Sequence, residues 1–437
     1  MAQKRGLTLI RDAEIEHIIG SYAAPLFKAA GLAPGAVRVH LVRDSALNAF
    51  VAGGQRVFIN TGLILRSESP NQIVGVIAHE TGHIAGGHLA RTQDALKNAS
   101  AQTIIAFILG AAAIVSGQGE MGNAILAGGR QVAERSLLRY SRSQEAAADQ
   151  AALTFLERTG QSPRGLVEFL AILGDQEALL SSTQDPYARS HPISRERISL
   201  LRSRMESSPY ADKSDSPETI AAFRRMQAKL TGFLEPPATT LRRYPTGDTS
   251  VPARYARAIA YHRMPALDKA LAEIDGLLAE APDDPFFHEL KGQILYENGR
   301  VAEAVAPYER AVQLLPDSPL LLFGLAQAQI ATGDPALNRA AIDRLRAAVR
   351  LQSQREGAGV WRLLAVAYGR DGRLGLSALA SAEQALLEGR PGDAKQFAER
   401  AAKLLPRNSP NWIRTRDIAG AADQERKRHR GRKQKKN

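Results

Sequence analysis

The sequence contains no cysteine among its 437 residues. Disulfide bonds, thiolate metal sites and cysteine nucleophiles are therefore excluded. The absence of cysteine is compatible with reducing and oxidising compartments alike, so it does not place the protein in either. Hydrophobic residues make up 44% of the chain, which is ample for a packed core, and the length suggests about three domains.

The chain also lacks a long apolar run and a signal peptide. The stretch TIIAFILGAAAIV at 103–115 holds thirteen residues, whereas a membrane-spanning helix needs about 20. We expect a buried or plug-like helix there, with membrane contact as the alternative. The first apolar run ends at Arg11–Asp12, too early for a signal peptide. Either the protein is not exported or this chain starts near a mature end.

Positive charge is in excess but is unevenly spread. The formal net charge is +12, and the segment Glu425–Asn437 holds eight Lys or Arg residues against one Glu. The basic composition therefore describes a tail more than a nucleic-acid-binding surface. We expect residues 421–437 to form a solvated, disordered tail. Attraction to an anionic membrane is the next alternative, and nucleic-acid binding is the least favoured.

Residue patterns in the N-terminal half predict helices and a small antiparallel sheet. The segment 14–31 is typical of a helix that ends at Gly31, and a further helix is expected at about 142–159. The alternating segment 37–42 predicts one strand. The segment 46–62 predicts two more strands joined by a Gly-Gly turn.

The segment 69–91 predicts a helix with a defined start. Ser69 is a good N-cap, Pro70 suits the first turn, and Gln72 completes a capping box. The pattern indicates that the polar residues further along this segment lie on a regular helix.

The sequence HETGH within this helix matches the metal-binding pattern H-E-x-x-H. Residues i and i+4 of a helix share one face, so His79 and His83 can bind the same ion through ring nitrogens. Glu80 can reach a water on that ion. His88 lies five residues past His83, about 140° round the helix, and is a poor ligand. A chance match is the alternative, and the capped helix makes it less favoured.

A catalytic zinc site needs a third protein ligand. The segment 141–153, SRSQEAAADQAAL, offers Glu145 and Asp149 four residues apart on a predicted helix. We assign Glu145 as a ligand and Asp149 as acceptor for a histidine N–H, with two solvent-exposed carboxylates as the alternative. Because Pro192 favours an extended backbone before it, His191 is expected on a loop that can approach the zinc. An ordinary surface histidine is the alternative.

The C-terminal half contains an internal repeat. It follows a Pro- and Ser-rich linker at 206–250, which holds one short helical piece at 219–230. Small, apolar and Pro residues then recur at shared offsets, namely Ala258, Pro265, Ala270, Ile274, Leu277 and Pro282; Gly292, Gly299, Ala304, Tyr308, Ala311 and Pro316; and Ala382, Gly389, Ala394, Ala398, Ala401 and Pro406. This is the tetratricopeptide pattern. It predicts a solenoid whose concave face binds peptide or protein, with an ordinary helical bundle as the alternative.

The segments HETGH, SRSQEAAAD and SHPISRERI, followed by these repeats, resemble the HtpX- and Oma-type gluzincin family of zinc metallopeptidases. The resemblance is closest to its periplasmic, BepA-like members, which assist β-barrel assembly. It covers about residues 7–420 and predicts an α+β, mostly α fold. The implied parts are a zincin-like metallopeptidase domain at 1–205 with a small antiparallel sheet, a linker at 206–250, an all-α tetratricopeptide solenoid at 251–420 and a basic disordered tail at 421–437.

The resemblance also implies roles for individual residues. One zinc ion per chain is expected, with Glu80 as general base and His191 as a removable fourth ligand that shuts the site. The other implied ligands and supports are His79, His83 and Glu145 on the ion, with Asp149 and Arg197 behind them.

The expected activity is zinc-dependent endoproteolysis in the periplasm, directed at misfolded or stalled outer-membrane proteins and assisting their assembly. The repeats would dock clients or the assembly machinery, and membrane-surface contact is left open. An edge strand at Asn48, Ala49 and Phe50 could hold an extended substrate by strand addition, although a lone strand is more often structural. The main alternative is a tetratricopeptide chaperone or adaptor with a dormant peptidase site. Nucleic-acid binding is supported by the tail alone.

Overall fold

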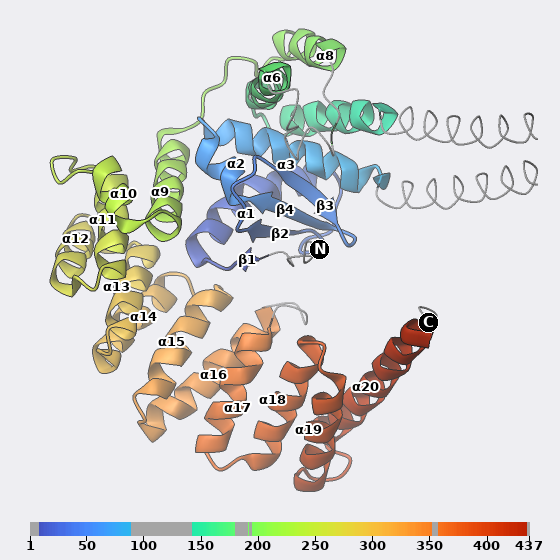
Figure 1. Cartoon of the computed structure of the whole chain (residues 1–437), viewed down its shortest axis with the longest axis vertical. Helices are drawn as coiled ribbons and strands as arrows, with labels where there is room; N and C mark the ends of the chain where they lie inside the picture. Colours follow the sequence, from blue (N-terminus) through green and yellow to red (C-terminus); the bar gives the residue numbers. More distant parts are fainter. Residues whose placement is uncertain (1–7, 89–141, 180–190, 192–194, 352–356, 435–437) are drawn as a thin grey trace, which may run out of the picture. The chain divides into compact units, whose positions relative to one another are not determined.

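The computed structural model describes residues 8–88, 142–179, 191, 195–351 and 357–434 (Figure 1). Contacts divide the chain into two compact units, Met1–Leu230 and Thr231–Asn437. The apolar segment 103–115, for which the sequence predicts a buried or plug-like helix, lies outside the described residues. Among the helices that are described, none has both the length and the apolarity that a membrane crossing requires.

The N-terminal unit is built on a four-stranded sheet with the strand order β1-β2-β4-β3. The strands are β1 (Leu9–Ile10), β2 (Arg38–Val42), β3 (Ala49–Ala52) and β4 (Arg56–Asn60). The sequence predicts an antiparallel sheet, and the structure corrects this, because β2 and β4 pair in parallel. The reason is topological. The hairpin β3–β4 inserts its second strand beside β2, so the chain runs out to the sheet edge before it returns.

Two long helices contact each other and the sheet. Helix α1 (Ala13–Ala29) starts at Asp12, whose side chain accepts a hydrogen bond from the Ile15 N–H at 2.9 Å. The short helix α2 (Thr61–Arg66) follows β4 directly. Helix α3 (Pro70–Ala85) runs along the sheet (Figure 1), and most of its residues are buried. This placement removes α3 from solvent on several sides.

The two ends of α3 follow from its sequence. At the start, the Ser69 hydroxyl accepts from the Gln72 N–H at 3.4 Å, and Gln72 Oε1 accepts from the Glu68 N–H at 3.0 Å. The helix ends at Ala85 rather than at residue 91 as predicted, because a Gly-Gly turn follows it. Gly87 has a φ of 63°, a left-handed conformation that glycine adopts without strain.

Helix α3 packs against two further helices at backbone distance. An added Cβ at Gly82 would lie 2.7 Å from the carbonyl oxygen of Ala148, in the helix that covers residues 142–158. An added Cβ at Gly75 would lie 2.6 Å from the backbone nitrogen of Leu166, in α6 (Arg164–Leu179). The glycines therefore set the distance between α3 and its neighbours. Helix α8 (Arg195–Glu206) packs in turn on α6.

The predicted linker is more ordered than its composition suggests. It contains α9 (Pro217–Leu234) and α10 (Pro237–Arg243), and the division between the two units falls within α9. Lys229 Nζ lies 2.9 Å from Asp12 and 3.3 Å from Glu14, and Arg225 also pairs with Glu14. Glu14 is fully buried, so these ion pairs compensate a charge that would otherwise be costly. The amino-acid composition of the linker could not show that its residues pair with residues at the start of the chain.

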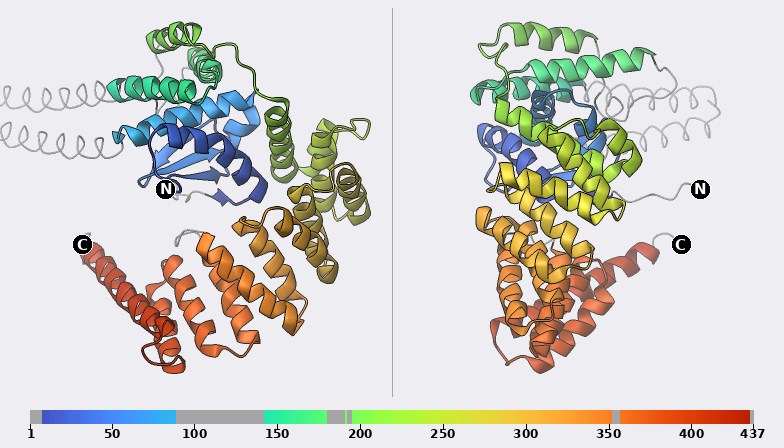
Figure 2. Two further views of the ribbon diagram at one scale, coloured as in Figure 1. Left: turned by 180° about the vertical axis from the view of Figure 1, so that it is seen from behind. Right: turned by 90° about the vertical axis from the view of Figure 1, so that its left-hand side faces the viewer.

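After α10, the C-terminal unit consists of helices that follow one another as antiparallel hairpins (Figure 2). They are α11 (Val251–Arg263), α12 (Leu267–Glu280), α13 (Pro285–Glu297), α14 (Val301–Leu314), α15 (Pro319–Ala331), α16 (Pro335–Leu351), α17 (Ala358–Arg370), α18 (Leu374–Leu387), α19 (Pro391–Leu404) and α20 (Pro410–Gln434). The predicted solenoid is thereby confirmed.

The small residues of the repeat pattern allow the two helices of a hairpin to cross closely, as their size predicts. Ala304 and Ala311 are fully buried, and an added Cβ at Gly292 would lie 2.7 Å from the Tyr308 ring. The two helices of this hairpin therefore cross with a glycine facing an aromatic ring. Pro316 follows the end of α14 by two residues, where a helix must stop.

The predicted disordered tail differs from the structure, in which α20 continues to Gln434. Thr415, Ile418 and Ala422 are buried and attach the first part of α20 to the solenoid. The basic residues beyond them are good helix formers, so they extend a helix that is already nucleated.

We expect Gly82→Ala to destabilise the N-terminal unit by about 1–3 kcal/mol, because a methyl group has no space against Ala148. Hydrogen exchange of the α3 amides would measure the loss in this unit alone. The control is Gly20→Ala in α1, where no atom lies within 4 Å of an added Cβ. That change should stabilise the helix by about 0.5–1 kcal/mol. Equal exchange rates in the two variants would contradict the packing argument.

Candidate metal centre

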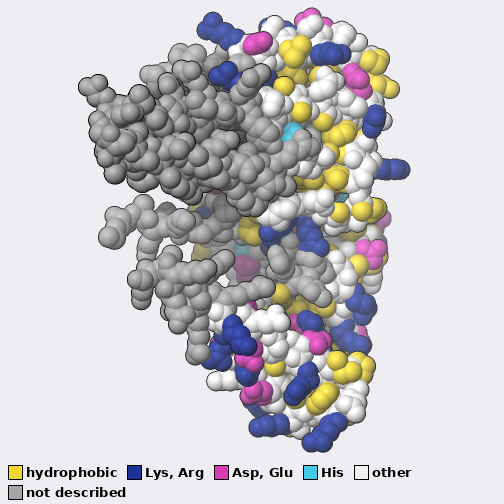
Figure 3. Space-filling view, turned by 90° about the vertical axis from the view of Figure 1, so that its right-hand side faces the viewer, with side chains coloured by type: hydrophobic (Ala, Val, Ile, Leu, Met, Phe, Trp, Pro, Cys, Tyr) yellow, Lys and Arg dark blue, Asp and Glu magenta, His cyan; other side chains and the backbone are white. Residues whose placement is uncertain are grey.

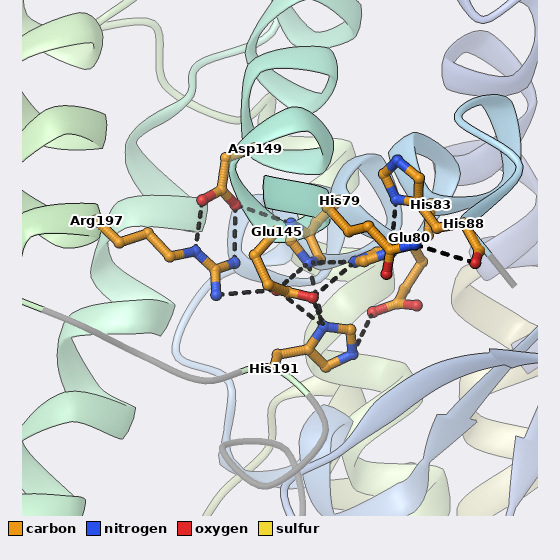
Figure 4. A network of polar contacts seen from close by, with 9 residues as sticks. His79, Glu80, His83, His88, Glu145, Asp149, His191 and Arg197 are labelled. Atoms are coloured by element: carbon orange, nitrogen blue, oxygen red, sulfur yellow. Dashed lines mark hydrogen bonds and ion pairs between the residues drawn. The ribbon is translucent and has the colours of Figure 1, made fainter. Parts of the chain in front are cut away.

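Side chains from α3, from the helix 142–158, and from His191 with the nearby start of α8 meet in one place (Figure 4). The side chains that point toward one another are His79, Glu80 and His83 from α3; Glu145 and Asp149 from the helix 142–158; His191; and Arg197 from α8. The structure thus brings together all of the predicted ligands and supporting residues. His191 lies outside any helix or strand, whereas Pro192 is outside the described residues.

Four of these residues direct donor atoms at one point. His79 Nε2 and His83 Nε2 are 3.1 Å apart, and the Glu145 oxygens lie 3.4 Å and 3.3 Å from them. His191 Nδ1 lies 3.4 Å from His79 Nε2 and 3.1 Å from Glu145 Oε2. All four donor atoms lie within 4.8 Å of one another.

This donor set fits a single zinc ion. Ligand atoms placed tetrahedrally at about 2.0–2.1 Å from zinc are separated by about 3.3 Å. The five separations above, which involve both oxygens of Glu145, span 3.1–3.4 Å. Three imidazole nitrogens and one carboxylate are also ligands that zinc prefers. Without a cation, this group would crowd ring nitrogens and a carboxylate into a buried space with few hydrogens to share.

Hydrogen bonds behind the donors fix their orientation. His79 Nδ1 lies 2.9 Å from Asp149 Oδ1, so this nitrogen donates its proton outward and turns the Nε2 lone pair to the centre. Arg197 Nε donates to Asp149 Oδ2 at 2.5 Å, and Arg197 Nη1 lies 2.9 Å from Glu145 Oε2. One guanidinium therefore holds both carboxylates in place.

The pKa values describe a site that attracts positive charge. Burial lowers the pKa of His79, but hydrogen bonds to Asp149 and Glu145 outweigh it and raise the pKa to about 9. Burial raises the pKa of Glu145, but hydrogen bonds to His191, His79 and His83 bring it far below its usual range. In the metal-free protein, a proton on His79 thus compensates the carboxylates. A metal cation would replace that proton.

Glu80 is a buried polar group of the site that accepts no hydrogen bond from the described residues. Its side chain is fully buried, and neither oxygen accepts a hydrogen bond from a described residue. His191 Nε2 lies 3.4 Å from Oε1 of Glu80. A buried carboxylate that accepts no hydrogen bond raises the free energy of the folded protein. This position of Glu80 is therefore suited to a molecule that enters from solvent and donates a proton to the carboxylate.

Helical spacing alone misplaces His88. The argument that it lies about 140° round the helix assumes that α3 continues, but α3 ends at Ala85. The turn at Gly86 and Gly87 returns the buried His88 to the ligand His83, and the two Nδ1 atoms are 3.0 Å apart. With Nε2 of His83 facing the centre, its Nδ1 carries the proton and donates to His88. The Gly-Gly pair before His88 was the signal that could have revealed this contact.

The predicted substrate strand lies at the sheet edge. Residues Ala49 and Phe50 belong to β3, which pairs with β4 and stands last in the strand order. Asn48 precedes the strand, and its carbonyl accepts from the Asn60 N–H at 2.9 Å. The Phe50 ring stacks on Phe58 with centroids 5.0 Å apart. Because β3 also contacts α3, an added strand there would lie near the helix that carries the metal ligands.

Comparison with known proteins agrees with this geometry. Residues 10–205 match the family described as Peptidase family M48, and residues 292–333 match a TPR repeat. The chain is 26% identical to a β-barrel assembly-enhancing protease of Yersinia pestis, over 80% of this chain and 71% of the relative. The corresponding protein of Escherichia coli strain K12 is 25% identical, over 75% of this chain and 67% of the relative. The metalloprotease LoiP of the same strain is 29% identical over 38% of this chain and 62% of its own length.

By these comparisons the protein is a zinc metalloendopeptidase whose residues 10–205 match Peptidase family M48, and the chain resembles β-barrel assembly-enhancing proteases over most of its length. The predicted combination of a metallopeptidase with tetratricopeptide repeats is confirmed. The roles of the individual site residues remain predictions that rest on the distances above.

We expect His88→Ala to weaken zinc binding by about 10- to 100-fold, because His83 would lose the acceptor that orients its ring. Competition with a chromogenic chelator would measure the affinity. His17→Ala is the matched control, since His17 is exposed on α1 and outside the donor group. A His88 variant that retains zinc as tightly as the His17 variant would refute this orienting role.

Proposed function

We propose that this protein is a periplasmic quality-control peptidase that degrades misfolded or stalled outer-membrane proteins and assists their assembly. The observation that carries the proposal is the four-donor group with the buried, unsatisfied carboxylate of Glu80 beside it. The substrate class and the compartment are supported by the names of the bacterial relatives, which are called β-barrel assembly-enhancing proteases.

We assign His79, His83 and Glu145 as the permanent ligands of one zinc ion. When bound, the ion would polarise the scissile carbonyl and lower the pKa of a water to about 7. Asp149 and Arg197 hold the ligands in position, through the contacts to His79 and Glu145 described above. The chain supplies these groups from rigid helices, which keeps the donor positions fixed between turnovers.

Glu80 acts as the general base. Its place next to His79 on α3 puts the carboxylate beside the donor group without making it part of that group. Since no described residue donates a hydrogen bond to it, the carboxylate is available to take a proton from a water. The same carboxylate then passes that proton to the nitrogen of the leaving amine.

His191 closes the site. Its ring lies between Glu145 and Glu80, with Nδ1 3.1 Å from one carboxylate and Nε2 3.4 Å from the other. The imidazole therefore fills the space that a water and a scissile bond must share. In this state the enzyme is latent, and activity requires that the segment carrying His191 move away.

An extended client is held at the edge strand. Ala49 and Phe50, with Asn48 directly before them, lie on β3, the last strand of the described sheet, where backbone hydrogen bonds would bind a substrate strand without regard to its sequence. This fits a quality-control enzyme, because only unfolded chains can present a free strand. The repeat domain, placed at 251–420 after the linker at 206–250, raises the local concentration of clients or of the assembly machinery.

The second candidate function is that of a chaperone or adaptor with a dormant peptidase site. It is favoured by the closed position of His191 and by the size of the repeat unit. The two functions are compatible, because binding through the repeats does not require cleavage. They are separated by asking whether a protein without Glu80 still supports outer-membrane assembly.

We expect Glu80→Gln to lower the cleavage of an unfolded substrate such as casein by about 10²–10⁴-fold, because an amide cannot accept the proton. Zinc content should remain at one ion per chain, since Glu80 is outside the donor group. Peptidase assays with metal analysis measure both quantities. Cleavage at the original rate would remove Glu80 from the mechanism, and full support of assembly by this variant would favour the chaperone function.

We expect His191→Ala to raise the cleavage of unfolded protein. If the open state holds about 1–10% of the molecules, removal of the side chain gives a rise of about 10- to 100-fold. The double variant Glu80→Gln/His191→Ala is the control, and it should be inactive if the gain arises at this site. An unchanged or lower rate in a His191→Ala protein that retains its zinc would show that His191 does not close the site.

A further inference from the structure

A basic pocket in the C-terminal unit takes no part in the proposed peptidase reaction. The cavity has a volume of about 460 Å³ and lies among α16, α17, α18 and α20. We use the name basic pocket for the cavity that is lined by Arg346, Arg350, Arg373, Arg414, Trp361 and Tyr368. It is built entirely from one compact unit.

The charge of the pocket is only partly compensated. Among the residues that the structure describes, Glu383 is the one acidic residue in the lining, and Arg414 uses both of its oxygens at 2.5 Å and 2.9 Å. Arg373 pairs with Asp371 at 2.7 Å while its side chain stays 48% exposed. Arg346 reaches only to 3.9 Å from Asp343, and its side chain is 57% exposed. An excess of positive charge therefore remains at the mouth of the pocket.

Two of the arginines stand in an arrangement that an anion would stabilise. Arg346 and Arg350 are four residues apart on α16, so they lie on the same helix face, and both line the pocket. Like charges at this spacing destabilise a helix. A carboxylate bound between them would reverse the sign of that interaction, and the planar guanidinium groups suit bidentate contacts with it.

The floor of the pocket is apolar and aromatic. Trp361 and Tyr368 are seven residues apart on α17, on one face, and Leu364 lies between them. Burial raises the pKa of Tyr368, while the charges of Arg346 and Arg373 oppose that rise. These arginines are therefore within electrostatic reach of the floor. An occupant that uses both parts of the pocket must combine an apolar group with negative charge.

We propose that the basic pocket binds an acidic segment of an extended polypeptide, with carboxylates on Arg346, Arg350 and Arg373 and an apolar side chain against Trp361. A nucleic acid fits less well, because binding of a single strand uses a basic groove that follows the backbone over several nucleotides. Here the basic groups gather around one cavity, and the face drawn in Figure 3 shows Lys and Arg of this unit beside Asp and Glu.

This pocket deepens the proposed function by giving the chemistry that the repeats recognise in a client. It rests on that function only for the identity of the client. Binding in the pocket requires neither zinc nor cleavage, so the two proposals can fail separately. The experiment therefore uses the full chain with Glu80→Gln, in which a bound peptide is not degraded.

The two tryptophans of the chain provide the readout. Trp361 lines the pocket, whereas Trp412 lies on α20 with its ring beside Arg416. With Trp412→Phe, Trp361 becomes the only tryptophan and its fluorescence reports the pocket. The probe is a twelve-residue peptide of Asp, Glu, Leu and Gly, acetylated and amidated at its ends. We expect a saturable shift in emission, and at least tenfold weaker binding when Asp and Glu are replaced by Asn and Gln.

Arginine variants locate the binding. Arg350→Gln and Arg373→Gln should each weaken binding of the acidic peptide about tenfold, the effect of losing one carboxylate contact. Arg362→Gln is the matched control, because Arg362 is exposed on α17 but does not line the pocket. A second version of the acidic peptide carries a free C-terminal carboxylate. If this version binds more tightly, the chain end supplies the negative charge; if it does not, internal side chains supply it. Either source supports a peptide site.

Three outcomes would overturn the proposal. The first is equal binding of the neutral peptide, and the second is an equal loss in Arg362→Gln and Arg350→Gln. The third is displacement of the acidic peptide by oligonucleotides or anionic vesicles at concentrations below its own Kd, which would assign the pocket to a different class of partner. Peptidase activity of the protein without Glu80→Gln is measured separately, and its presence or absence decides the function of the zinc site alone.

Discussion

The contact between Gly82 and Ala148 is the constraint on which the metal centre depends. It places two helix backbones so close that an added Cβ would lie 2.7 Å from a carbonyl oxygen. At that distance the short side chain of Asp149 reaches His79, and Glu145 reaches both ligating histidines. A larger residue at either position would separate the helices and with them the carboxylates from the imidazoles.

The electrostatics of the site follow from this close approach. Glu145 and Asp149 are buried, and burial of charge is costly unless it is paired. Arg197 contacts both carboxylates, and it lies on the helix that follows the segment carrying His191. The position of α8 is therefore linked to the two carboxylates. We infer that a movement of His191 out of the site must either leave the ion pairs of Arg197 with Glu145 and Asp149 intact or replace them.

The two units use small residues for different purposes. In the peptidase unit, a glycine brings functional groups from separate helices within reach of one ion. In the repeat unit, Gly292 and its counterparts only let two helices of a hairpin cross closely, and the functional groups project elsewhere. The arginines and aromatic residues of the basic pocket come from α16, α17 and α20 and from Arg373, which directly precedes α18.

Local patterns in the sequence determined the elements and the donor types. The i, i+4 spacing of His79 and His83 and the offsets of the repeats follow from helix geometry, so both could be predicted. Tertiary structure decided what depends on partners distant in the chain. It set the parallel pairing of β2 with β4. It also set the ion pair between Glu14 and Lys229 of α9, and the contact of His88 with the ligand His83. Periodicity describes one element at a time, whereas these features arise where elements meet.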